Sequence, residues 1–284
     1  MGLPHGLPLP HPVCMPHLRS VSRRPDAVVD PEQFPFSVPA VRALGMLELS
    51  ERVTFFVGEN GSGKSTLLEG IAAAARLPTV GSSEVDSDET LAAQRQLGSA
   101  LRLTWSHRTH TGFYLRAEDF FGFTKSLSRM RSEFRQRLAE IDVEYQARSD
   151  HARALARGPI VASLHDMERR YGIDLDANSH GQSFLKLFQS RFVPGGLHLL
   201  DEPEAPLSPQ SQLALLAMLL DMVSDGAQFV IATHSPILLA FPGARIYSFD
   251  SVPPVETPYA ELDHVALTRD FLADPERFLR HLRS

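Results

Sequence analysis

Two hydrophobic patterns alternate along this chain of 284 residues and predict its strands and helices. Apolar, β-branched or aromatic runs without polar alternation are typical of parallel strands that are buried on both faces. Apolar residues at steps of three and four are typical of helices that bury one face. The predicted strands are residues 52–58, 100–105, 112–115, 196–200, 228–233 and 245–249. The predicted helices that accompany them are residues 65–76, 208–225 and 268–283.

The middle of the chain carries the longest helical pattern. Apolar side chains recur at helical spacing between residues 126 and 156, and charged side chains occupy the opposite face. We expect one helix of about 30 residues, roughly 45 Å long, that ends at Gly158 and Pro159. A shorter helix at 163–171 should then pack back. The apolar positions of the long helix are Leu127, Met130, Phe134, Leu138, Ile141 and Tyr145.

Because strands and helices alternate on both sides of this helical stretch, the sequence predicts an α/β fold with an inserted α-helical subdomain. Residues 18–284 form one domain in this interpretation, and the insertion covers about 119–177. Residues 1–17 are rich in Pro, His and Gly and are predicted to be a disordered tail. Its spacing of two His around a Cys could suit a metal, but no fourth ligand lies nearby, so a solvated tail is favoured. Polar residues at 81–90 predict a loop.

Composition and charge limit the classes of function. The net charge of −6 lacks the basic excess of a dedicated nucleic-acid binder, although a local basic groove on an acidic protein would escape this argument. The single cysteine excludes an internal disulfide. No apolar run approaches the roughly 18–20 residues that span a bilayer, and the start of the chain lacks the pattern of a secretory signal. We therefore expect a cytoplasmic protein without membrane insertion.

A phosphate-binding loop is predicted at GENGSGKS, which matches G-x-x-x-x-G-K-[ST] at every required position. It follows a predicted buried strand and opens a predicted helix. Glycines let backbone N–H groups close around phosphates, and the helix directs its positive end at them. Lys64 should reach the β- and γ-phosphates, and Ser65 should give its hydroxyl to Mg²⁺. The predicted nucleotide-binding residues here are Gly58, Asn60, Gly61, Ser62, Gly63, Lys64, Ser65 and Thr66.

Two carboxylates follow the predicted strand at 196–200. Asp201 and Glu202 lie at its carboxyl end, where α/β sheets place their ligands. We expect Asp201 to hold Mg²⁺ directly or through water. Glu202 should orient the attacking water or accept its proton. His198 interrupts the apolar run and is more consistent with a core or edge histidine than with a ligand.

With these two motifs in place, the chain resembles the ABC-type ATPases. Residues 178–184, NSHGQSF, are similar to the signature motif LSGGQ and lie upstream of the two carboxylates, as in that family. Asn178 and His180 replace the usual Leu and Gly. The positions that match the motif are Ser179, Gly181 and Gln182. The signature lies at the start of a helix, where backbone N–H groups face phosphate.

Further segments resemble the same family in the same order. His234, in IATHS at the end of the predicted strand 228–233, matches the switch histidine that contacts the γ-phosphate. Residues 205–208, APLS, lie where the family has its D-loop, with Pro206 as a departure. Phrases such as LLDEPEAPLSPQ and IATHSPILLA are similar to small stand-alone bacterial proteins known loosely as AAA-family ATPases. The resemblance implies a P-loop fold of the ABC type, with a mixed sheet flanked by helices.

The resemblance also implies an activity and a partner. The expected reaction is hydrolysis of ATP to ADP and phosphate with Mg²⁺, and Glu202 and His234 are the expected catalytic residues. The expected assembly is a head-to-tail homodimer in which Ser179 and Gly181 of one subunit cover the nucleotide of the other. A further protein partner of unknown identity is compatible with this interpretation.

Two elements of the family are not clearly found. The stretch 113–121 occupies the place of the Q-loop and offers Arg116 and Glu118, but no glutamine. The aromatic residue that stacks on adenine could be Phe34 or Phe36, and both could instead be core residues.

Three other functions remain open at this point. One is the nucleotide-binding subunit of a membrane transporter, which the missing Q-loop glutamine disfavours. Another is a DNA-associated repair or chromosome-type ATPase, for which five Lys or Arg against two acids at 122–140 are a hint that a solvated helix face explains better. The last is a P-loop kinase, which Glu202 and His234 disfavour because they suit water as the acceptor.

Overall fold

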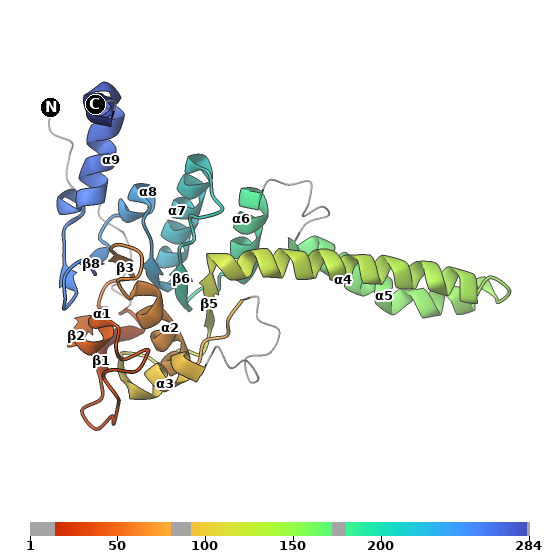
Figure 1. Cartoon of the computed structure of the whole chain (residues 1–284). Coiled ribbons are helices and arrows are strands. Elements are labelled where there is room, and N and C mark those ends of the chain that lie inside the picture. The colour runs from red at the N-terminus through yellow and green to blue at the C-terminus, as the bar shows by residue number, and fades with distance from the viewer. Residues whose placement is uncertain (1–14, 81–91, 172–179, 283–284) are drawn as a thin grey trace.

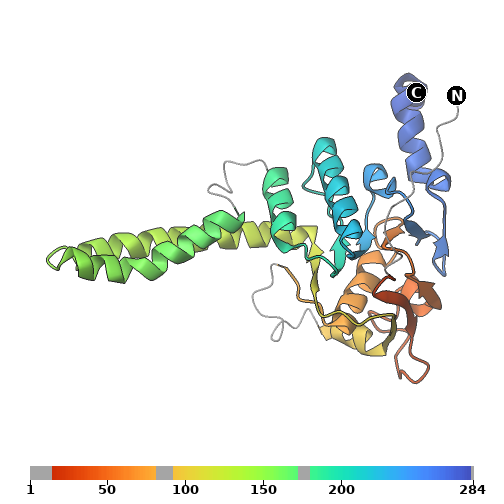
Figure 2. The ribbon, with the colours of Figure 1, turned by 180° about the vertical axis from the view of Figure 1, so that it is seen from behind.

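The computed structural model describes residues 15–80, 92–171 and 180–282. An α/β head carries a long helical arm on one side (Figures 1 and 2). The predicted tail is therefore described only at its end. There the backbone N–H of Ser106 donates to the His17 carbonyl at 2.8 Å. The predicted loop at 81–90 and residues 1–14 lie outside the described residues.

A six-stranded sheet forms the centre of the head, in the order β5-β6-β7-β3-β8-β9. Neighbouring strands pair in parallel, except that β9 is antiparallel to β8. Every residue of β3, β6 and β7 is buried, which explains their apolar runs without alternation. The strands are β3 (Val53–Val57), β5 (Gly112–Arg116), β6 (Leu197–Asp201), β7 (Gln228–Ala232), β8 (Arg245–Ser248) and β9 (Val255–Glu256). The strands predicted at 52–58, 112–115, 196–200, 228–233 and 245–249 are confirmed.

A smaller antiparallel sheet, in the order β2-β1-β4, lies beside the first. Its strands are β1 (Leu18–Arg23), β2 (Met46–Glu48) and β4 (Leu101–Trp105), of which only β4 was predicted. The buried side chain of Gln228 joins the two sheets. Its Oε1 accepts from the Leu18 N–H at 2.8 Å, and its Nε2 donates to the carbonyls of Leu18 and Leu49 at 2.8 and 2.9 Å. A buried amide with these partners satisfies backbone groups that the end of β1 leaves free.

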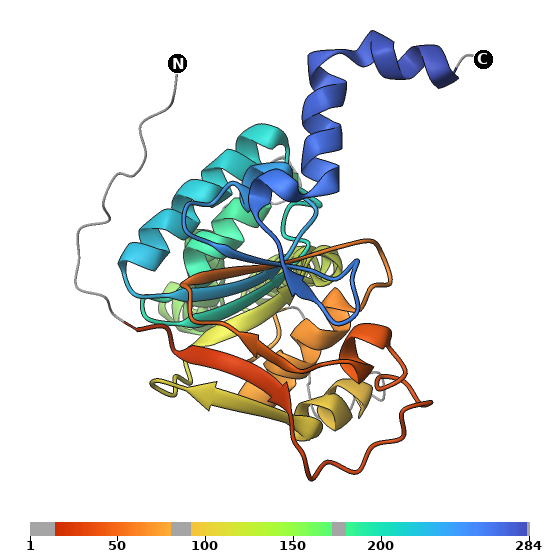
Figure 3. The ribbon, with the colours of Figure 1, turned by 90° about the vertical axis from the view of Figure 1, so that its left-hand side faces the viewer.

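Helices cover both faces of the central sheet (Figure 3). The sheet lies between two apolar clusters, because alternate residues of its strands belong to one cluster and to the other. One face carries α2 (Lys64–Ala75) and α3 (Ala92–Ala100) together with the smaller sheet. The other face carries α6 (His180–Arg191), α7 (Pro209–Ser224) and α8 (Pro236–Leu239), and the short α1 is Pro39–Arg42. This arrangement confirms the predicted mixed sheet flanked by helices. Among the described helices none is both long and apolar enough to cross a membrane.

The arm is a pair of helices, α4 (Ala117–Glu144) and α5 (Asp150–Tyr171), that run side by side. The prediction of one helix over 126–156 is therefore wrong. A turn separates the two helices, and Ser149 begins the second, because its Oγ accepts from the Ala152 N–H at 3.3 Å. The apolar positions of the predicted helix end at Tyr145, which is the C-cap of α4, so the extension of that helix to residue 156 had no apolar support.

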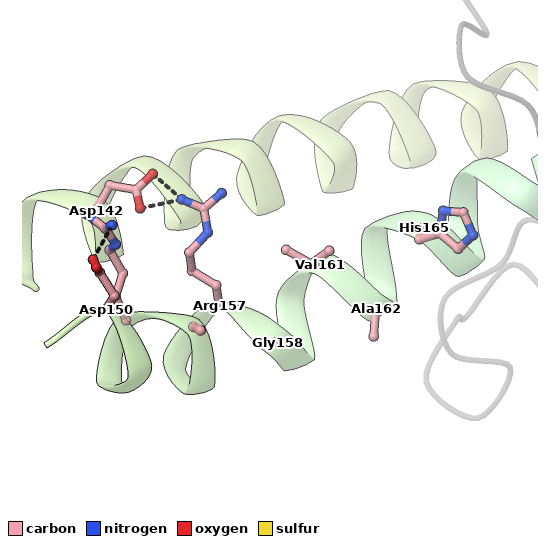
Figure 4. Close-up of a pocket in the computed structure, with 9 residues that line it drawn as sticks. Asp142, Asp150, Arg157, Gly158, Val161, Ala162 and His165 are labelled. Atoms are coloured by element: carbon pink, nitrogen blue, oxygen red, sulfur yellow. Dashed lines mark hydrogen bonds and ion pairs between the residues drawn. The ribbon is translucent and has the colours of Figure 1, made fainter.

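Pro159 lies inside α5 and does not end a helix, contrary to the prediction. Asp142 of α4 and Arg157 of α5 form an ion pair across the arm, and Figure 4 shows the two side chains facing each other. A cavity of about 860 Å³ lies beside this pair, between the two helices. The packing of α5 on α4 therefore holds the helix through its proline, because tertiary contacts override a local preference.

The C-terminal segment is also divided. The predicted helix at 268–283 is instead two helices, α9 (Asp263–Ala273) and α10 (Pro275–Leu282), which follow a 3₁₀ turn at Tyr259–Glu261. Asp274 has φ −147° and ψ 76°, which lie outside the helical region. A residue before proline is disfavoured in the helical region, and proline is favoured in the first turn of a helix. The Asp274-Pro275 step therefore ends α9 and begins α10.

Two helix glycines should respond oppositely to the same substitution. A Cβ at Gly98 of α3 would lie 2.9 Å from both the Ala73 Cβ and the Ala74 backbone nitrogen, whereas a Cβ at Gly122 of α4 would meet nothing within 4 Å. Gly98→Ala should lower the free energy of unfolding by about 1–3 kcal/mol because α3 must move away from α2. Gly122→Ala should raise it by about 0.5–1 kcal/mol through helix propensity. Urea titration followed by circular dichroism measures both, and changes of the same sign would contradict the close packing of α2 and α3.

Candidate functional site

The loop between β3 and α2 presents uncapped backbone N–H groups. Gly58, Gly61 and Gly63 have φ values of 137°, 83° and 102°, which side chains disfavour. A Cβ at Gly63 would also lie 2.6 Å from the Val38 Cγ1. Gly63 is the N-cap of α2, and no side chain caps this helix. The first turn of a helix of 12 residues is therefore open to an anionic group from outside the chain.

Lys64 lies at the base of this loop and is only 4% exposed. Its Nζ donates to the carbonyl oxygens of Gly58 and Glu59 at 2.6 and 2.9 Å. Burial lowers the pKa of Lys64, while the nearby carboxylates of Glu202 and Asp201 raise it. The loop thus surrounds a buried ammonium group with its own backbone.

Ser65 lies in the first turn of α2, and Asp201 is the last residue of β6. Their side chains contact each other. The Ser65 Oγ donates to the Asp201 Oδ1 at 3.0 Å. Burial raises the pKa of Asp201 to about 7, against the opposing effect of this hydrogen bond. A cation at this position would favour the ionised carboxylate. One hydroxyl and one carboxylate suit Mg²⁺, which usually keeps phosphate and water oxygens as its other ligands. Within the described ranges no cluster of three His, Cys, Asp or Glu could hold a metal on its own.

Glu202 and His234 face the same region from the ends of neighbouring strands. The His234 Nε2 and the Glu202 Oε1 are 3.9 Å apart, too far for a direct hydrogen bond and close enough to contact one group between them. Glu202 has φ 49°, and its backbone N–H donates to the Ala232 carbonyl at 2.9 Å. Positive φ at a non-glycine residue is uncommon and concentrates at functional sites. The Nε2 of His234 is buried and has no hydrogen-bond partner within the described part of the chain.

Glu204 belongs to this region and was not found by sequence reasoning. Its Oε1 accepts from the backbone N–H of His234 at 2.7 Å. Burial raises the pKa of Glu204, while this hydrogen bond lowers it. A second carboxylate two residues after Glu202 in DEPE was the available signal.

Asp250, at the end of β8, was also missed. Its Oδ1 accepts from the backbone N–H of Glu59 at 2.8 Å and therefore supports the phosphate-binding loop from the side. An acid directly after the predicted strand 245–249 was the signal. A cavity of about 1100 Å³ opens beside the loop there, and His234 and His264 both line it. The C-terminal segment thus forms one wall next to the loop.

The end of β5 occupies the place expected for the Q-loop. Arg116 pairs in register with Asp201 across β5 and β6. Its guanidinium forms an ion pair with Glu69 of α2 and donates to the Tyr114 hydroxyl at 3.1 Å. Burial raises the pKa of Tyr114 well above its usual value. Arg116 therefore lies at the position where the resemblance implies a glutamine, and it has contacts with β5, β6 and α2.

The remaining predicted site residues are only partly described. Ser179 lies outside the described residues, and of Gly181 and Gln182 only the backbone, in the first turn of α6, is described. Asn60, Ser62 and Thr66 lie in the loop and the first turn of α2, as their sequence positions require. For adenine stacking, Phe36 is 2% exposed and belongs to the core, whereas Phe34 is 54% exposed. Phe34 alone therefore remains a candidate.

His198 is a core residue. It is fully buried among the rings of Phe113, Phe192 and Phe229, and its Nε2 lies 3.3 Å from the Val193 carbonyl oxygen. Burial lowers its pKa to about 4. The prediction of a core or edge histidine is confirmed.

Comparisons with known proteins concern both sequence and fold. A family model described as AAA domain matches residues 41–94. No curated protein matches the chain significantly. A nucleotide-free ATP-binding cassette from an ABC transporter is 16% identical, with coverage of 91% of this chain and 96% of that chain and a TM-score of 0.46.

Two further solved structures are heads of chromosome-type proteins. The SMC head domain from Thermotoga maritima is 13% identical, with coverage of 85% of this chain and 98% of that chain and a TM-score of 0.41. The Smc head domain with an extended coiled coil, bound to the C-terminal domain of ScpA and derived from Pyrococcus furiosus, is 12% identical. Coverage there is 95% of this chain and 100% of that chain, with a TM-score of 0.42.

The burial of His198 predicts a pH dependence of stability. The unfolded chain binds a proton at this ring near pH 6.5, whereas the folded protein resists protonation until about pH 4. The stability that the neutral ring supports is therefore complete above pH 6.5 and is lost as pH falls toward 4. Between pH 7 and pH 5 the free energy of unfolding should fall by about 2 kcal/mol more in the wild type than in His198→Leu. Urea titrations at the two pH values measure this, and equal losses would contradict a neutral buried ring.

Proposed function

Taking the chain as a P-loop ATPase domain of the ABC type, which its AAA-domain match and the order of its motifs support, we propose that it binds ATP with Mg²⁺ and hydrolyses it. One observation carries the proposal. The uncapped first turn of α2, the buried Lys64 ammonium and the Ser65–Asp201 pair lie around a single point. Backbone dipoles, a point charge and a cation site are what a triphosphate requires.

Binding exchanges internal contacts of the loop for contacts with phosphate. Lys64 gives up its hydrogen bonds to the Gly58 and Glu59 carbonyls and donates to the β- and γ-phosphate oxygens. The backbone N–H groups from Gly61 to Ser65 close around the same oxygens. Thr66 continues the first turn of α2 behind them. Phe34, an exposed aromatic residue in the turns before α1, is the proposed stacking partner of adenine.

Ser65 and Asp201 are the proposed residues that hold Mg²⁺. The ion, when bound, neutralises charge that develops on the phosphate oxygens. Their hydrogen bond at 3.0 Å keeps both oxygens near one position before any ion arrives. Burial raises the pKa of Asp201, and a cation bound beside it would favour the ionised form.

Glu202 and His234 are the proposed catalytic residues. Water attacks the γ-phosphorus in line with the bond to the leaving ADP oxygen, and its proton passes to the Glu202 carboxylate. His234 donates from its imidazole to a γ-phosphate oxygen and holds that group in place. The separation of 3.9 Å between the two side chains lets a single water molecule contact both of them. Hydrolysis then yields ADP and phosphate.

The proposed working unit is a head-to-tail homodimer that closes on ATP. Residues 178–184 would cover the partner's nucleotide, with Ser179, Gly181 and Gln182 as contacts. Support comes from the start of α6 at His180, because a helix that begins at this motif directs its N–H groups at phosphate. Opening after hydrolysis would transmit work to a process and protein partner that remain to be identified.

The charges on the arm favour this proposal over a DNA-associated ATPase. Three of the basic residues at 122–140, Arg129, Arg135 and Arg137, lie within 4 Å of acids on the arm itself. Their charge is therefore partly balanced within α4 and α5, which supports a solvated helix face. Salt-dependent stimulation of hydrolysis by DNA would favour the alternative.

Removing the ammonium group of Lys64 tests nucleotide binding. Lys64→Ala should weaken ATP binding at least about tenfold and abolish measurable turnover, because charge-assisted hydrogen bonds to phosphate are lost. Isothermal titration and phosphate release measure the two quantities. Lys125→Ala, on the exposed face of the arm, is the matched control and should leave both unchanged. Wild-type affinity and turnover in Lys64→Ala would overturn the phosphate site.

Removing the proton acceptor tests both hydrolysis and assembly. Glu202→Gln should lower turnover by about 100-fold or more while ATP affinity is kept, because an amide orients water but does not accept its proton. With ATP and Mg²⁺ the variant should accumulate as a dimer in light scattering. Lys64→Ala combined with Glu202→Gln should stay monomeric. A Glu202→Gln chain that stays monomeric at saturating ATP contradicts the homodimer.

A further inference from the structure

The parallel ladder of the central sheet ends one residue before His234. The backbone N–H of Thr233 donates to the Phe56 carbonyl at 3.1 Å and is the last such bond from β7 toward β3. The next N–H, that of His234, points to the opposite side of β7, toward β6, and donates to the Oε1 of Glu204 at 2.7 Å. A side chain from the loop after β6 therefore takes the place of a strand carbonyl at the end of the β6–β7 ladder.

We infer that Glu204 is a positioning residue for hydrolysis, which fixes the peptide between Thr233 and His234 and through it the imidazole of His234. This inference rests on the proposed role of His234. A carboxylate is a strong acceptor for a backbone N–H, and a bond of 2.7 Å is at the short end of the usual range. Glu204 itself does not contact the reacting atoms in this assignment.

The surroundings of Glu204 match a role in holding the backbone. Its Oε2 is inaccessible to solvent and has no hydrogen-bond partner in the described ranges, so the carboxyl group is not oriented by bulk water. The backbone after His234 is fixed separately. The Ser235 Oγ donates to the Gln212 Oε1 at 2.6 Å and accepts from the Leu238 N–H at 3.1 Å.

Glu204 therefore sets the orientation of the peptide between Thr233 and His234, which its neighbours do not fix. The Thr233 bond and the Ser235 cap fix the chain on either side of His234, but neither fixes the orientation of the peptide that carries the His234 N–H. Rotation of that peptide changes the backbone angles that direct the imidazole. Misplacing a catalytic group by about 1 Å can cost 100-fold in rate.

The loop that carries Glu204 also carries Glu202 and leads into residues 205–208. The Ala205 N–H donates to the Glu202 carbonyl at 3.0 Å, and the Leu207 N–H donates to the Glu204 carbonyl at 2.8 Å. The turn is thus bonded internally. One rigid loop consequently sets the position of Glu202 directly and that of His234 through Glu204.

Three substitutions separate the reach of the side chain from its charge. Glu204→Gln keeps an oxygen at the same distance from the backbone, so turnover should stay within about threefold of wild type. Glu204→Asp keeps the charge but withdraws it by one methylene, and Glu204→Ala removes it. Both should lower kcat by about 10- to 100-fold with an unchanged dissociation constant for ADP. Phosphate release, ADP titration and thermal midpoints are measured for all three variants and for wild type.

A double-mutant cycle with His234→Ala tests whether Glu204 acts through His234. If it does, Glu204→Ala should lower the turnover of His234→Ala by less than about twofold, although it lowers wild-type turnover strongly. Equal factors in the two backgrounds would overturn the inference. Retained turnover in Glu204→Asp with loss in Glu204→Gln would also overturn it, as would equal turnover in all three variants. Failure of the proposed function gives a different result from failure of this inference. In that case the wild type would not hydrolyse ATP, or His234→Ala would have the same turnover as the wild type.

Discussion

The pairing of three parallel strands, β6, β7 and β3, is the constraint on which the candidate site depends. Ala232 of β7 pairs with Asp201 on one side and with Phe56 on the other. The three strands consequently end at the same level of the sheet. The phosphate-binding loop, the two carboxylates and His234 come from distant parts of the sequence and lie together because these carboxyl ends are flush. A shift of β7 by one residue would turn its side chains to the opposite face and separate the groups.

The candidate site has more acidic than basic side chains. Lys64 is buried next to acids at positions 201, 202, 204 and 250, whose charges all favour its ammonium form. Burial opposes ionisation of both Asp201 and Glu204, whose pKa values are raised. Four carboxylates thus lie near one lysine, and a further cation would balance their charge. Binding of a triphosphate alone would add negative charge, which favours the proposal that nucleotide and metal bind together.

Much of the head could be predicted from the sequence because its strands are buried on both faces. The runs at 52–58, 196–200 and 228–233 have no polar alternation, and each is a central strand. β1 is partly exposed, and β2 has only three residues, so their patterns do not differ from those of loops. In the arm the apolar period stops at Tyr145, the C-cap of α4, and the capping residue Ser149 marks the start of the second helix.

In the candidate site, too, features within one segment could be predicted from the sequence, whereas contacts between distant segments could not. Residues of the phosphate-binding loop could be predicted, because their function requires particular residue types at fixed spacing along one segment. The contacts of Glu204 with His234 and of Asp250 with Glu59 join segments 30 and 191 residues apart. No spacing rule covers such pairs. A carboxylate after a buried strand was the common signal, and it gave the position without the partner.

The arm is inserted between two elements of the site. At one end, α4 begins at Ala117, directly after Arg116, which pairs in register with Asp201 and contacts Glu69 of α2. At the other end, α5 closes at Tyr171, and the next described element is α6, which starts within the signature-like motif at His180. A displacement at the carboxyl end of β5 therefore moves the start of α4 with it, since no flexible linker intervenes. Because α4 and α5 are joined by their packing and by the Arg157–Asp142 ion pair, the motion reaches α5 as well. The arm thus extends from the edge of the sheet proposed to hold Mg²⁺ to α6, which α5 contacts and which carries part of the segment proposed to contact a second subunit.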